Sequence, residues 1–206
     1  MGVVTALRAT RRGRISVFVD DAYACSVSEA LLAKRRLYQG LELDEDGLET
    51  LRAEASAERV LADAHRLLAQ RQRSREELRR RLLQKEHTEE VVAATLDRLE
   101  GDGLLDDAAF AEAYVADKRR LGGWGAERIR RGLAQLGVPA ETAERALVSA
   151  GDDDLERALA LLRRRGAPRA PLEAARRRAF AALQRRGFPS PVCYTAVRRW
   201  LADDES

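Results

Sequence analysis

The strongest constraint on the fold of this chain is an internal repeat that recurs three times after residue 56. Leu82, Leu133 and Leu183 lie 51 and 50 residues apart, and apolar residues surround each of them at helical spacing. Apolar positions at i, i+3, i+4 and i+7 are typical of an amphipathic helix with one buried face. A repeat of this length is typical of small units that complete their cores by packing against neighbours. The sequence therefore predicts a tandem array of helical units.

Each copy is predicted to contain three helices joined by two turns. The offset between copies is 47 residues in the first helices and 50 or 51 in the later ones, so the later copies have a longer first connection. The predicted copies are 57–105, 106–151 and 152–206, the last ending in the short acidic tail Asp203-Asp204-Glu205. They align through matched apolar positions: Ala64, Ala111 and Ala158 in the first helices, Leu78, Ile129 and Ala179 in the second, and Leu96, Leu147 and Val197 in the third.

The turn between the second and third helices carries a recognisable signal in two copies. These copies contain Gly137-Val138-Pro139 and Gly187-Phe188-Pro189, and glycine followed by proline is typical of a helix end. The first copy has Glu86 in place of the glycine. We expect its turn to be either looser or built differently.

Residues 1–56 are predicted to form a small β-rich segment followed by two helices. Three short β-prone runs, 3–7, 15–19 and 23–27, are separated by charged turns, which indicates an antiparallel meander. The segment is either an accessory clamp or a cap on the helical array.

The two helices of this segment are predicted from their end signals. Ser28 is expected to cap the first helix and Gly40 to close it, and the second is expected to run from about Asp44 to Ala53. The predicted fold class is therefore mainly α: a tandem array of three-helix repeats with a small N-terminal β-rich and helical segment.

Composition agrees with a helical fold and excludes several classes of protein. Hydrophobic residues make up 45% of the chain and aromatic residues only 5%, which favours helices over a sheet sandwich. Cys25 and Cys193 are far apart and have no cysteine or histidine companions, so neither a zinc site nor a disulfide is expected. No apolar run is long enough for a signal peptide or a membrane span. We expect a cytoplasmic protein, a monomer, with no membrane partner.

The placement of charge is more informative than the net charge of +3. The second helices are predicted to be basic, and the stretch 163–199 carries eleven arginines against one acid, Glu173. Individual arginines can simply solvate helix faces, but an excess of like charge destabilises a compact unit and indicates an anionic partner. Phosphates and acidic protein surfaces both fit this pattern. Arg79 and Arg80 also align with Arg130 and Arg131, so a repeated row of guanidinium groups is expected.

Several motifs resemble chemical sites, but none of them completes one. Asp106-Asp107 and Asp152-Asp153-Asp154 fall where first helices begin, so we interpret them as helix caps rather than as catalytic or metal-binding carboxylates. The glycines around Trp124 lack the lysine and hydroxyl residue of a phosphate-binding loop. His65 and His87 have no partner of complementary chemistry nearby in the sequence. We therefore expect no enzymatic activity, no metal and no cofactor.

Four stretches of the chain resemble the RecX family of recombination regulators. They are RSREELRRRLLQK at 73–85, GDGLLDDAAFAEAYV at 101–115, GGWGAERIRRGLAQLGV at 122–138 and ALQRRGF at 182–188. Together with the β-rich start, the resemblance covers almost the whole chain. It is carried by the combination rather than by any single motif.

The resemblance implies a bacterial protein of tandem three-helix repeats that binds the RecA filament on DNA. Proteins of this family are expected to dampen RecA's ATP hydrolysis, strand exchange and stimulation of repressor self-cleavage, and to bind DNA weakly and largely without specificity. On this basis we assign RecA or DNA contacts to the arginines of the second helices and to Trp124, which is either an exposed anchor or part of the core. Tyr114 and Phe110 are expected to be packing residues. The candidate contact residues are Arg71, Arg73, Arg75, Arg79, Arg80, Arg119, Arg120, Arg128, Arg130, Arg131, Arg176, Arg177, Arg178, Arg185, Arg186 and Trp124.

Two other classes of function remain open at this stage. The first is a helical regulator that binds DNA directly and acts without RecA, because helix-turn-helix units also have basic second helices. Against it, the second helices have few of the Asn and Gln side chains that read bases. The second is a hydrolase or nuclease that uses the aspartate clusters. Loss of metal-dependent turnover on Asp106→Asn or Asp107→Asn substitution would support that interpretation.

Overall fold

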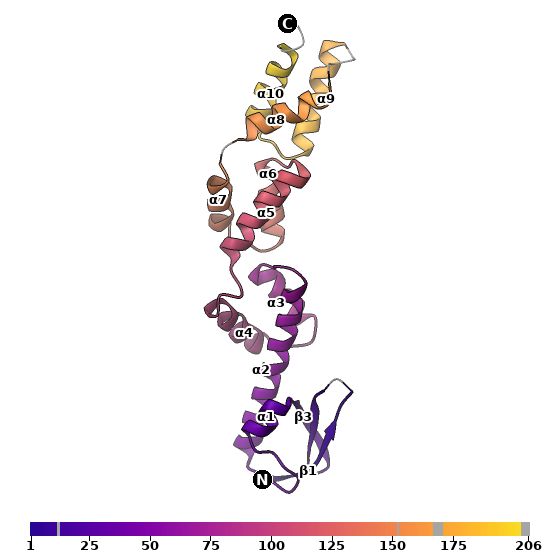
Figure 1. Ribbon diagram of the computed structural model, residues 1–206, viewed down its shortest axis with the longest axis vertical. Helices are drawn as coiled ribbons and strands as arrows, with labels where there is room; N and C mark the ends of the chain where they lie inside the picture. Colours follow the sequence, from indigo (N-terminus) through magenta and orange to yellow (C-terminus); the bar gives the residue numbers. More distant parts are fainter. Residues whose placement is uncertain (12, 152, 167–170, 203–206) are drawn as a thin grey trace. The chain divides into compact units, whose positions relative to one another are not determined.

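The computed structural model describes residues 1–11, 13–151, 153–166 and 171–202, which fall into two compact units (Figure 1). The first unit comprises Met1–Gln72 and Leu78–Leu104, and the second comprises Arg73–Glu77 and Leu105–Ser206. Asp152 and the predicted acidic tail, Asp203-Asp204-Glu205, lie outside the described residues. The protein is mainly helical and carries a small N-terminal sheet, as the sequence predicted.

The N-terminal segment forms a four-stranded antiparallel sheet. The predicted three-strand meander is confirmed, and a short fourth strand pairs with the other edge of the first. Asp20 and Asp21 make the tight turn between the second and third strands, both in the left-handed region that short polar side chains tolerate. In the order β3-β2-β1-β4 the strands are β1 (Gly2–Ala9), β2 (Ile15–Val19), β3 (Ala22–Val27) and β4 (Glu42–Leu43).

The first helix, α1 (Glu29–Lys34), is shorter than the sequence predicted. Ser28 caps it as expected, because the Leu31 amide donates to the Ser28 hydroxyl. However, the helix ends before Arg36, which adopts a left-handed φ of 49°, rather than continuing to Gly40. This turn brings Leu37 into the core of the segment, so burial of an apolar side chain ends the helix earlier than the glycine signal indicated.

Helix α2 (Glu45–Gln70) corrects the predicted break between the N-terminal segment and the first repeat. The helix expected at 44–53 and the first helix of the first copy are one continuous helix of 26 residues. Asp44 caps its start by accepting a hydrogen bond from the Gly47 amide at 2.8 Å. The stretch around residue 56 contains neither glycine nor proline and is rich in helix-forming residues, so nothing in it ends the helix.

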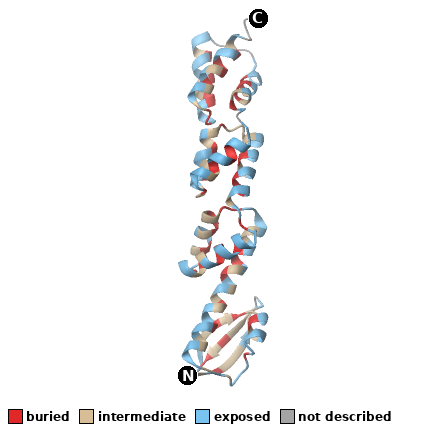
Figure 2. Cartoon of the chain, turned by 90° about the vertical axis from the view of Figure 1, so that its left-hand side faces the viewer, coloured by how far each residue is buried: buried red, intermediate tan, exposed pale blue. Residues whose placement is uncertain are grey.

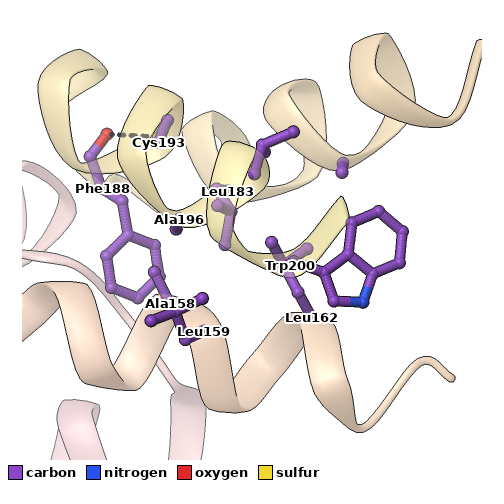
Figure 3. Close-up of a cluster of buried hydrophobic side chains, with 10 residues drawn as sticks. Ala158, Leu159, Leu162, Leu183, Phe188, Cys193, Ala196 and Trp200 are labelled. Carbon is purple, nitrogen blue, oxygen red and sulfur yellow. Dashed lines mark hydrogen bonds between the residues drawn. The ribbon is translucent and has the colours of Figure 1, made fainter. Parts of the chain in front are cut away.

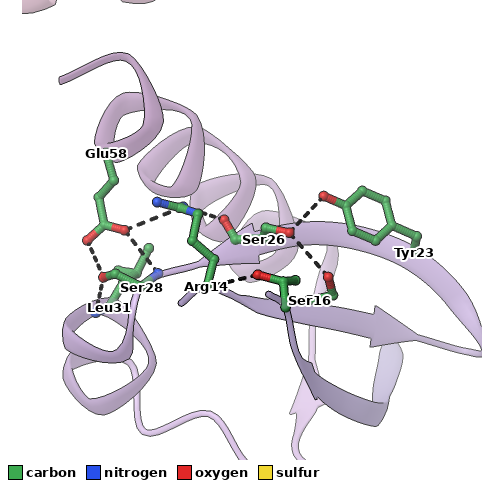
Figure 4. A network of polar contacts seen from close by, with 8 residues as sticks. Arg14, Ser16, Tyr23, Ser26, Ser28, Leu31 and Glu58 are labelled. Atoms are coloured by element: carbon green, nitrogen blue, oxygen red, sulfur yellow. Dashed lines mark hydrogen bonds and ion pairs between the residues drawn. The ribbon is translucent and has the colours of Figure 1, made fainter. Parts of the chain in front are cut away.

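A polar network joins α2 to the sheet (Figure 4). Glu58 on α2 accepts a hydrogen bond from the Ser28 hydroxyl at 2.9 Å and lies 3.8 Å from the guanidinium of Arg14. Arg14 also donates to the backbone carbonyl of Ser26 at the end of β3. The long helix therefore belongs to the N-terminal core at one end and to the first repeat at the other.

The first repeat consists of the end of α2, α3 (Arg75–Leu83) and α4 (Glu89–Gly101). The apolar positions that defined the repeat, Leu78, Leu82 and Leu96, are completely buried. Figure 2 shows that buried residues recur along the helices of the chain. Helical spacing therefore identified the core of this repeat correctly.

The second and third repeats form the second unit and have separate cores. The second repeat comprises α5 (Asp107–Gly122), α6 (Ala126–Gln135) and α7 (Ala140–Ser149), packed around Ile129 and Leu133. The third comprises α8 (Asp154–Arg163), α9 (Leu172–Arg185) and α10 (Ser190–Ala202).

The core of the third repeat contains Leu183, Phe188 and Trp200 together with Cys193 (Figure 3). The Cys193 thiol donates to the Phe188 carbonyl at 3.4 Å. Burial raises the pKa of this thiol to about 11, with a further contribution from Glu127. Cys193 is therefore a packing residue with little thiolate character at neutral pH.

The turn between the second and third helices contains a left-handed residue at the same place in every repeat. Glu86, Gly137 and Gly187 have φ values of 63°, 79° and 83°, all left-handed. Glu86 thus adopts a conformation that glycine would adopt more readily. The first turn is nevertheless built differently, as expected: the Val138 and Phe188 amides donate to the carbonyls of Leu133 and Leu183 at 3.0 and 3.2 Å, and the His87 amide makes no equivalent bond among the described residues.

The second unit also contains two junctions made from matching parts. Between the second and third repeats, the Gly125 amide donates to the Arg186 carbonyl at 2.8 Å and the Glu127 amide to the Gly187 carbonyl at 3.0 Å. The other junction joins residues 73–77 to the second repeat, where the hydroxyl of Ser74 donates to the Leu136 carbonyl. In both junctions the start of one second helix meets the glycine turn of the following repeat.

Candidate functional site

The structure brings four of the predicted contact residues together in one groove of the second unit. The groove has a volume of about 380 Å³ and lies over α6, between the α5–α6 loop and the end of α9. Its lining, as far as the structure describes it, includes no aspartate or glutamate. The lining residues are Tyr114, Trp124, Arg128, Arg131, Gly132, Gln135 and Arg185.

The glycines of the α5–α6 loop position Trp124. Gly123 ends α5 in the left-handed conformation, which lets the Trp124 amide donate back to the Lys118 carbonyl at 3.1 Å. A Cβ atom at Gly122 would lie 2.7 Å from the indole ring, and one at Gly125 would meet the backbone of Gly187 and of the residue after it. The run of glycines is therefore required by helix termination and close packing, and it does not form a phosphate-binding loop.

Trp124 is half-buried and combines the two roles considered from sequence. Part of its ring packs against the core of the second repeat. The guanidinium of Arg128 lies 4.0 Å from the ring centroid, and the ammonium of Lys118 lies 5.0 Å from it. These cation–π contacts hold two positive charges close to one aromatic side chain at the edge of the groove.

Tyr114 supplies a second aromatic wall. Its hydroxyl lies in the space that a side chain at Gly132 would occupy, and Lys118 lies 5.0 Å from the centroid of its ring. Burial raises the pKa of the Tyr114 phenol above its ordinary value despite the nearby charge of Arg128. The phenol is therefore neutral at physiological pH and acts as a packing group. The prediction that Phe110 and Tyr114 pack in the core is confirmed.

The charges that line this groove suit an anionic group. Arg128 donates to the Arg185 carbonyl at 3.3 Å, which anchors it between repeats, while Arg131 and Arg185 are exposed on either side. Guanidinium groups bind phosphate or carboxylate oxygens in a planar, two-pronged geometry. The groove can therefore receive a phosphodiester or an acidic side chain.

Other predicted contact residues are paired with acids within their own repeat. Arg79 on α3 makes two hydrogen bonds to Glu89 on α4, at 2.6 and 2.7 Å. Arg130 on α6 pairs in the same way with Glu144 on α7. Arginines at matching positions therefore pair with acids at different positions of the third helix, and each pair offsets part of the positive charge expected there.

Two predicted contact residues have structural roles. Arg73 is only 7% exposed and donates to Glu77 at 2.6 Å. Arg119 is also largely enclosed, and it donates to the carbonyls of Ala150 at 2.6 Å and Gly151 at 3.0 Å. These side chains hold backbone and helix ends together, so we leave them out of the proposed contact surface.

The remaining predicted residues lie at several separate places. Arg186 lines a smaller hollow of about 290 Å³ with Arg164 and Arg165, whereas Arg176 and Arg177 line a groove between α9 and α10. Arg120 pairs with Asp117 at 3.2 Å. Arg75 is half-buried at the start of α3, and Arg71, Arg80 and Arg178 are exposed.

The aspartate clusters serve helix starts and repeat junctions. Asp106 caps α5 by accepting from the amides of Ala108 and Ala109, as predicted. Asp107 accepts from the Arg75 amide at 2.7 Å. In the second cluster the predicted cap is not formed, because Asp153 precedes α8 but its side chain makes no capping hydrogen bond. Asp154 is buried and accepts from the Ala126 amide at 3.2 Å, so it occupies the equivalent place in the next junction. In the described part of the chain, no three His, Cys, Asp or Glu side chains are grouped as they would be to hold a metal ion.

Sequence reasoning missed an ion pair between the half-buried Arg157 and the buried Asp154, next to Trp124. Arg157 donates to Asp154 at 2.8 Å and also to the carbonyl of Trp124. Burial lowers the pKa of Arg157, although the carboxylates of Asp154 and Asp153 act in the opposite direction. The spacing of 47 residues between Asp107 and Asp154 is the sequence signal that would have indicated their common role.

Family models match the chain at all three repeats. The models described as the first, second and third three-helix domains of RecX match residues 56–99, 106–147 and 152–197, in that order. No helix among the described residues combines the length and apolar character needed to cross a membrane.

Curated relatives are similar over most of this chain. Proteins called regulatory protein RecX are 33% identical over 155 residues in Halalkalibacterium halodurans and 36% identical over 148 residues in Levilactobacillus brevis. The matches cover 72% and 71% of this chain but only 58% and 56% of those relatives. The matched region therefore spans little more than half the length of these relatives.

Two solved structures have a similar fold. A crystal structure of regulatory protein RecX matches 98% of this chain and all of that chain, with a TM-score of 0.70 and 25% identity. A RecX structure from Lactobacillus salivarius matches 70% of this chain and 96% of that chain, with a TM-score of 0.63 and 20% identity. The second likeness concerns the fold alone.

Proposed function

The chain belongs to the RecX family, and from this premise we propose that it is a regulatory protein that binds the RecA filament on DNA in the cytoplasm. Its binding inhibits ATP hydrolysis, strand exchange and coprotease activity by RecA. The protein acts as a monomer and without catalysis of its own. The observation that carries the proposal is the ordered match of all three repeats to the three RecX domains.

The groove around Trp124 is the proposed contact with the filament. It concentrates three guanidinium groups, Arg128, Arg131 and Arg185, between two repeats of one compact unit. A RecA filament on DNA offers phosphates and acidic side chains in a regular array, and both are ligands that guanidinium groups bind. Arg131 and Arg185 are the residues expected to reach the partner, because Arg128 is held under the indole ring.

The test is to titrate the chain into RecA assembled on single-stranded DNA while following ATP hydrolysis. We expect the unmodified chain to lower the rate, and the double substitution Arg131→Glu with Arg185→Glu to require at least about tenfold more protein for the same effect, because it removes two contacts of an interface. Arg59→Glu with Arg145→Glu is the matched control, since it makes the same charge change at two exposed sites outside the groove.

Two results would contradict different parts of the proposal. If the unmodified chain leaves ATP hydrolysis unchanged at saturating concentration, regulation of RecA is wrong for this protein. If the double variant folds and inhibits as well as the unmodified chain, the groove is not the contact. Circular dichroism spectra and melting temperatures establish that the variants are folded.

A second candidate function is direct binding of DNA without RecA. It is favoured by the aromatic walls of the same groove, because Trp124 and Tyr114 lie among cations, as in sites that bind single strands. Tight binding to DNA alone, with an affinity that falls steeply as salt is raised, would support this function. Weak, sequence-independent binding to DNA alone would instead indicate that the DNA contact only assists binding to RecA.

A further inference from the structure

A second groove in the third repeat has a different chemistry. It lies between α9 and α10 and has a volume of about 840 Å³. Three apolar residues, Phe180, Val197 and Leu201, form what we call its floor. Its edges carry Leu172 and Tyr194, whose exposed fractions are 54% and 59%. Large apolar side chains with this exposure, gathered along a groove, are typical of a docking surface.

Comparison with the second repeat explains why the groove is apolar. Phe180 and Tyr194 lie 50 residues after Arg130 and Glu144, which make the ion pair between α6 and α7. In the third repeat the two rings pack against each other instead, with centroids 4.5 Å apart and planes tilted by 43°. The same position in the same fold therefore carries an ion pair in one repeat and an aromatic surface in the next.

The edge of this groove is positively charged. Arg176, Arg177 and Arg198 line it together with one acid, Glu173. Glu173 is well exposed and lies 3.9 Å from Arg176, a distance at which surface ion pairs contribute little. The groove thus combines an apolar floor with a guanidinium edge that is largely uncompensated within the described lining.

We propose that the groove between α9 and α10 docks an acidic segment of a partner protein that carries a large apolar side chain. Nucleic acid fits less well, because a base could stack on an aromatic ring of this groove but would gain little from its aliphatic side chains, Leu172, Val197 and Leu201. A peptide satisfies both parts of the surface: its apolar side chain enters the floor, and its carboxylates meet the arginines. The inference is independent of RecA, and it separates Arg176 and Arg177 from the groove around Trp124.

The test is fluorescence anisotropy with the full chain and a labelled peptide of about 12 residues, long enough for three helical turns. The peptide consists of glutamates that flank a central Leu-Phe pair. We expect saturable binding that weakens at least about tenfold on the double substitution Arg176→Glu with Arg177→Glu. A peptide with glutamine in place of glutamate, and one with serine in place of Leu-Phe, are both expected to bind more weakly.

Two variants keep the test decisive. Tyr194→Ser alters an exposed edge of the floor without removing a buried side chain, and it is expected to weaken peptide binding. Arg59→Glu with Arg145→Glu, at exposed sites outside both grooves, is the matched control and should bind the peptide as the unmodified chain does.

Several outcomes would overturn the inference. They are binding that survives both Arg176→Glu with Arg177→Glu and Tyr194→Ser, and oligodeoxythymidylate displacing the peptide from the unmodified chain. Self-association of the chain that Tyr194→Ser abolishes would also overturn it, since a second copy would then be the occupant. If the unmodified chain binds the peptide but does not inhibit ATP hydrolysis by RecA, the result contradicts the proposed function and leaves this inference standing.

Discussion

The first repeat and the two that follow it fill the same pair of core positions with different chemistry. In the first repeat, Asp63 on α2 accepts a hydrogen bond from the His87 ring at 3.0 Å, and both side chains are buried. In the second repeat the aligned residues are Phe110 and Val138, which pack in an apolar core. The fold therefore requires that this space be filled and that any polar group in it be paired, but it does not require a particular residue.

The third repeat gives a further solution at the same positions. Arg157 lies with its guanidinium 5.8 Å from the ring of Phe188, and the same guanidinium pairs with Asp154. The repeats thus share a three-helix arrangement of the backbone, whereas the residues in their cores and on their surfaces differ. This explains how one fold can present an ion pair on α6 and α7 and an apolar groove on α9 and α10.

The largest expected effect concerns the glycine turns of the later repeats. We expect Gly187→Ala to lower the free energy of unfolding by about 2–4 kcal/mol, since alanine is strained at φ 83° and its Cβ would collide with the backbone of Arg128. Chemical denaturation of both variants measures this. Gly151→Ala is the matched control: it has the same φ, but no described atom lies within 4 Å of the added Cβ, so only about 1–2 kcal/mol is expected. Equal losses would mean that the collision at Gly187 is relieved at no cost.

A smaller effect is expected at the polar pair of the first repeat. Burial alone would raise the pKa of Asp63, but hydrogen bonds from His87 and Lys85, helped by Arg66, bring it below its ordinary value. The ionised carboxylate therefore stabilises the folded state above the pKa of an unfolded aspartate, near 3.9, and this stability is lost as the pH falls below it. We expect Asp63→Asn to cost about 1–2 kcal/mol near pH 7.

The difference between wild type and Asp63→Asn should narrow as the pH falls below about 4, the ordinary range of an aspartate. Denaturation curves measured across this range test the prediction. A difference that stays constant would show that the charge of Asp63 contributes nothing and that only the shape of the side chain matters.

The smallest effect should have the opposite sign. Glu86→Gly places glycine where the first repeat already has a left-handed φ of 63°, so we expect the variant to be more stable by up to about 1 kcal/mol. Differential scanning calorimetry can detect the corresponding rise in Tm. A fall in stability would mean that Glu86 makes a favourable interaction that outweighs its backbone strain.

Local signals predicted the elements well where packing agreed with them. The caps at Ser28 and Asp106 formed as expected, because a side chain that accepts from amides at a helix start needs only its immediate neighbours. The end of α1 was predicted wrongly, because burial of Leu37 outweighed the glycine signal. The prediction also divided α2 into two helices. The stretch that packs in the N-terminal core and the stretch that begins the first repeat were assigned to separate helices, although one helix contains both.

The candidate grooves show a similar division. Trp124 and the arginines of the second helices were identified from sequence, but Lys118, Tyr114 and Gln135 were not assigned to any site with them. No sequence signal indicated that Arg130 pairs with Glu144 or that Arg119 donates to carbonyls 31 and 32 residues away. Exposure and pairing depend on contacts between helices, and these are not encoded by the spacing within one helix.

The amino-acid sequence by itself determined the period, the three-helix units, their buried leucines and the excess of arginine in the third copy, since each is a local or periodic property. The tertiary structure alone decided which arginines are neutralised, which meet Trp124, and which border the apolar groove between α9 and α10. The physical reason is that a guanidinium is long and flexible, so its partner is selected by whichever carboxylate, carbonyl or ring the neighbouring helices bring within reach.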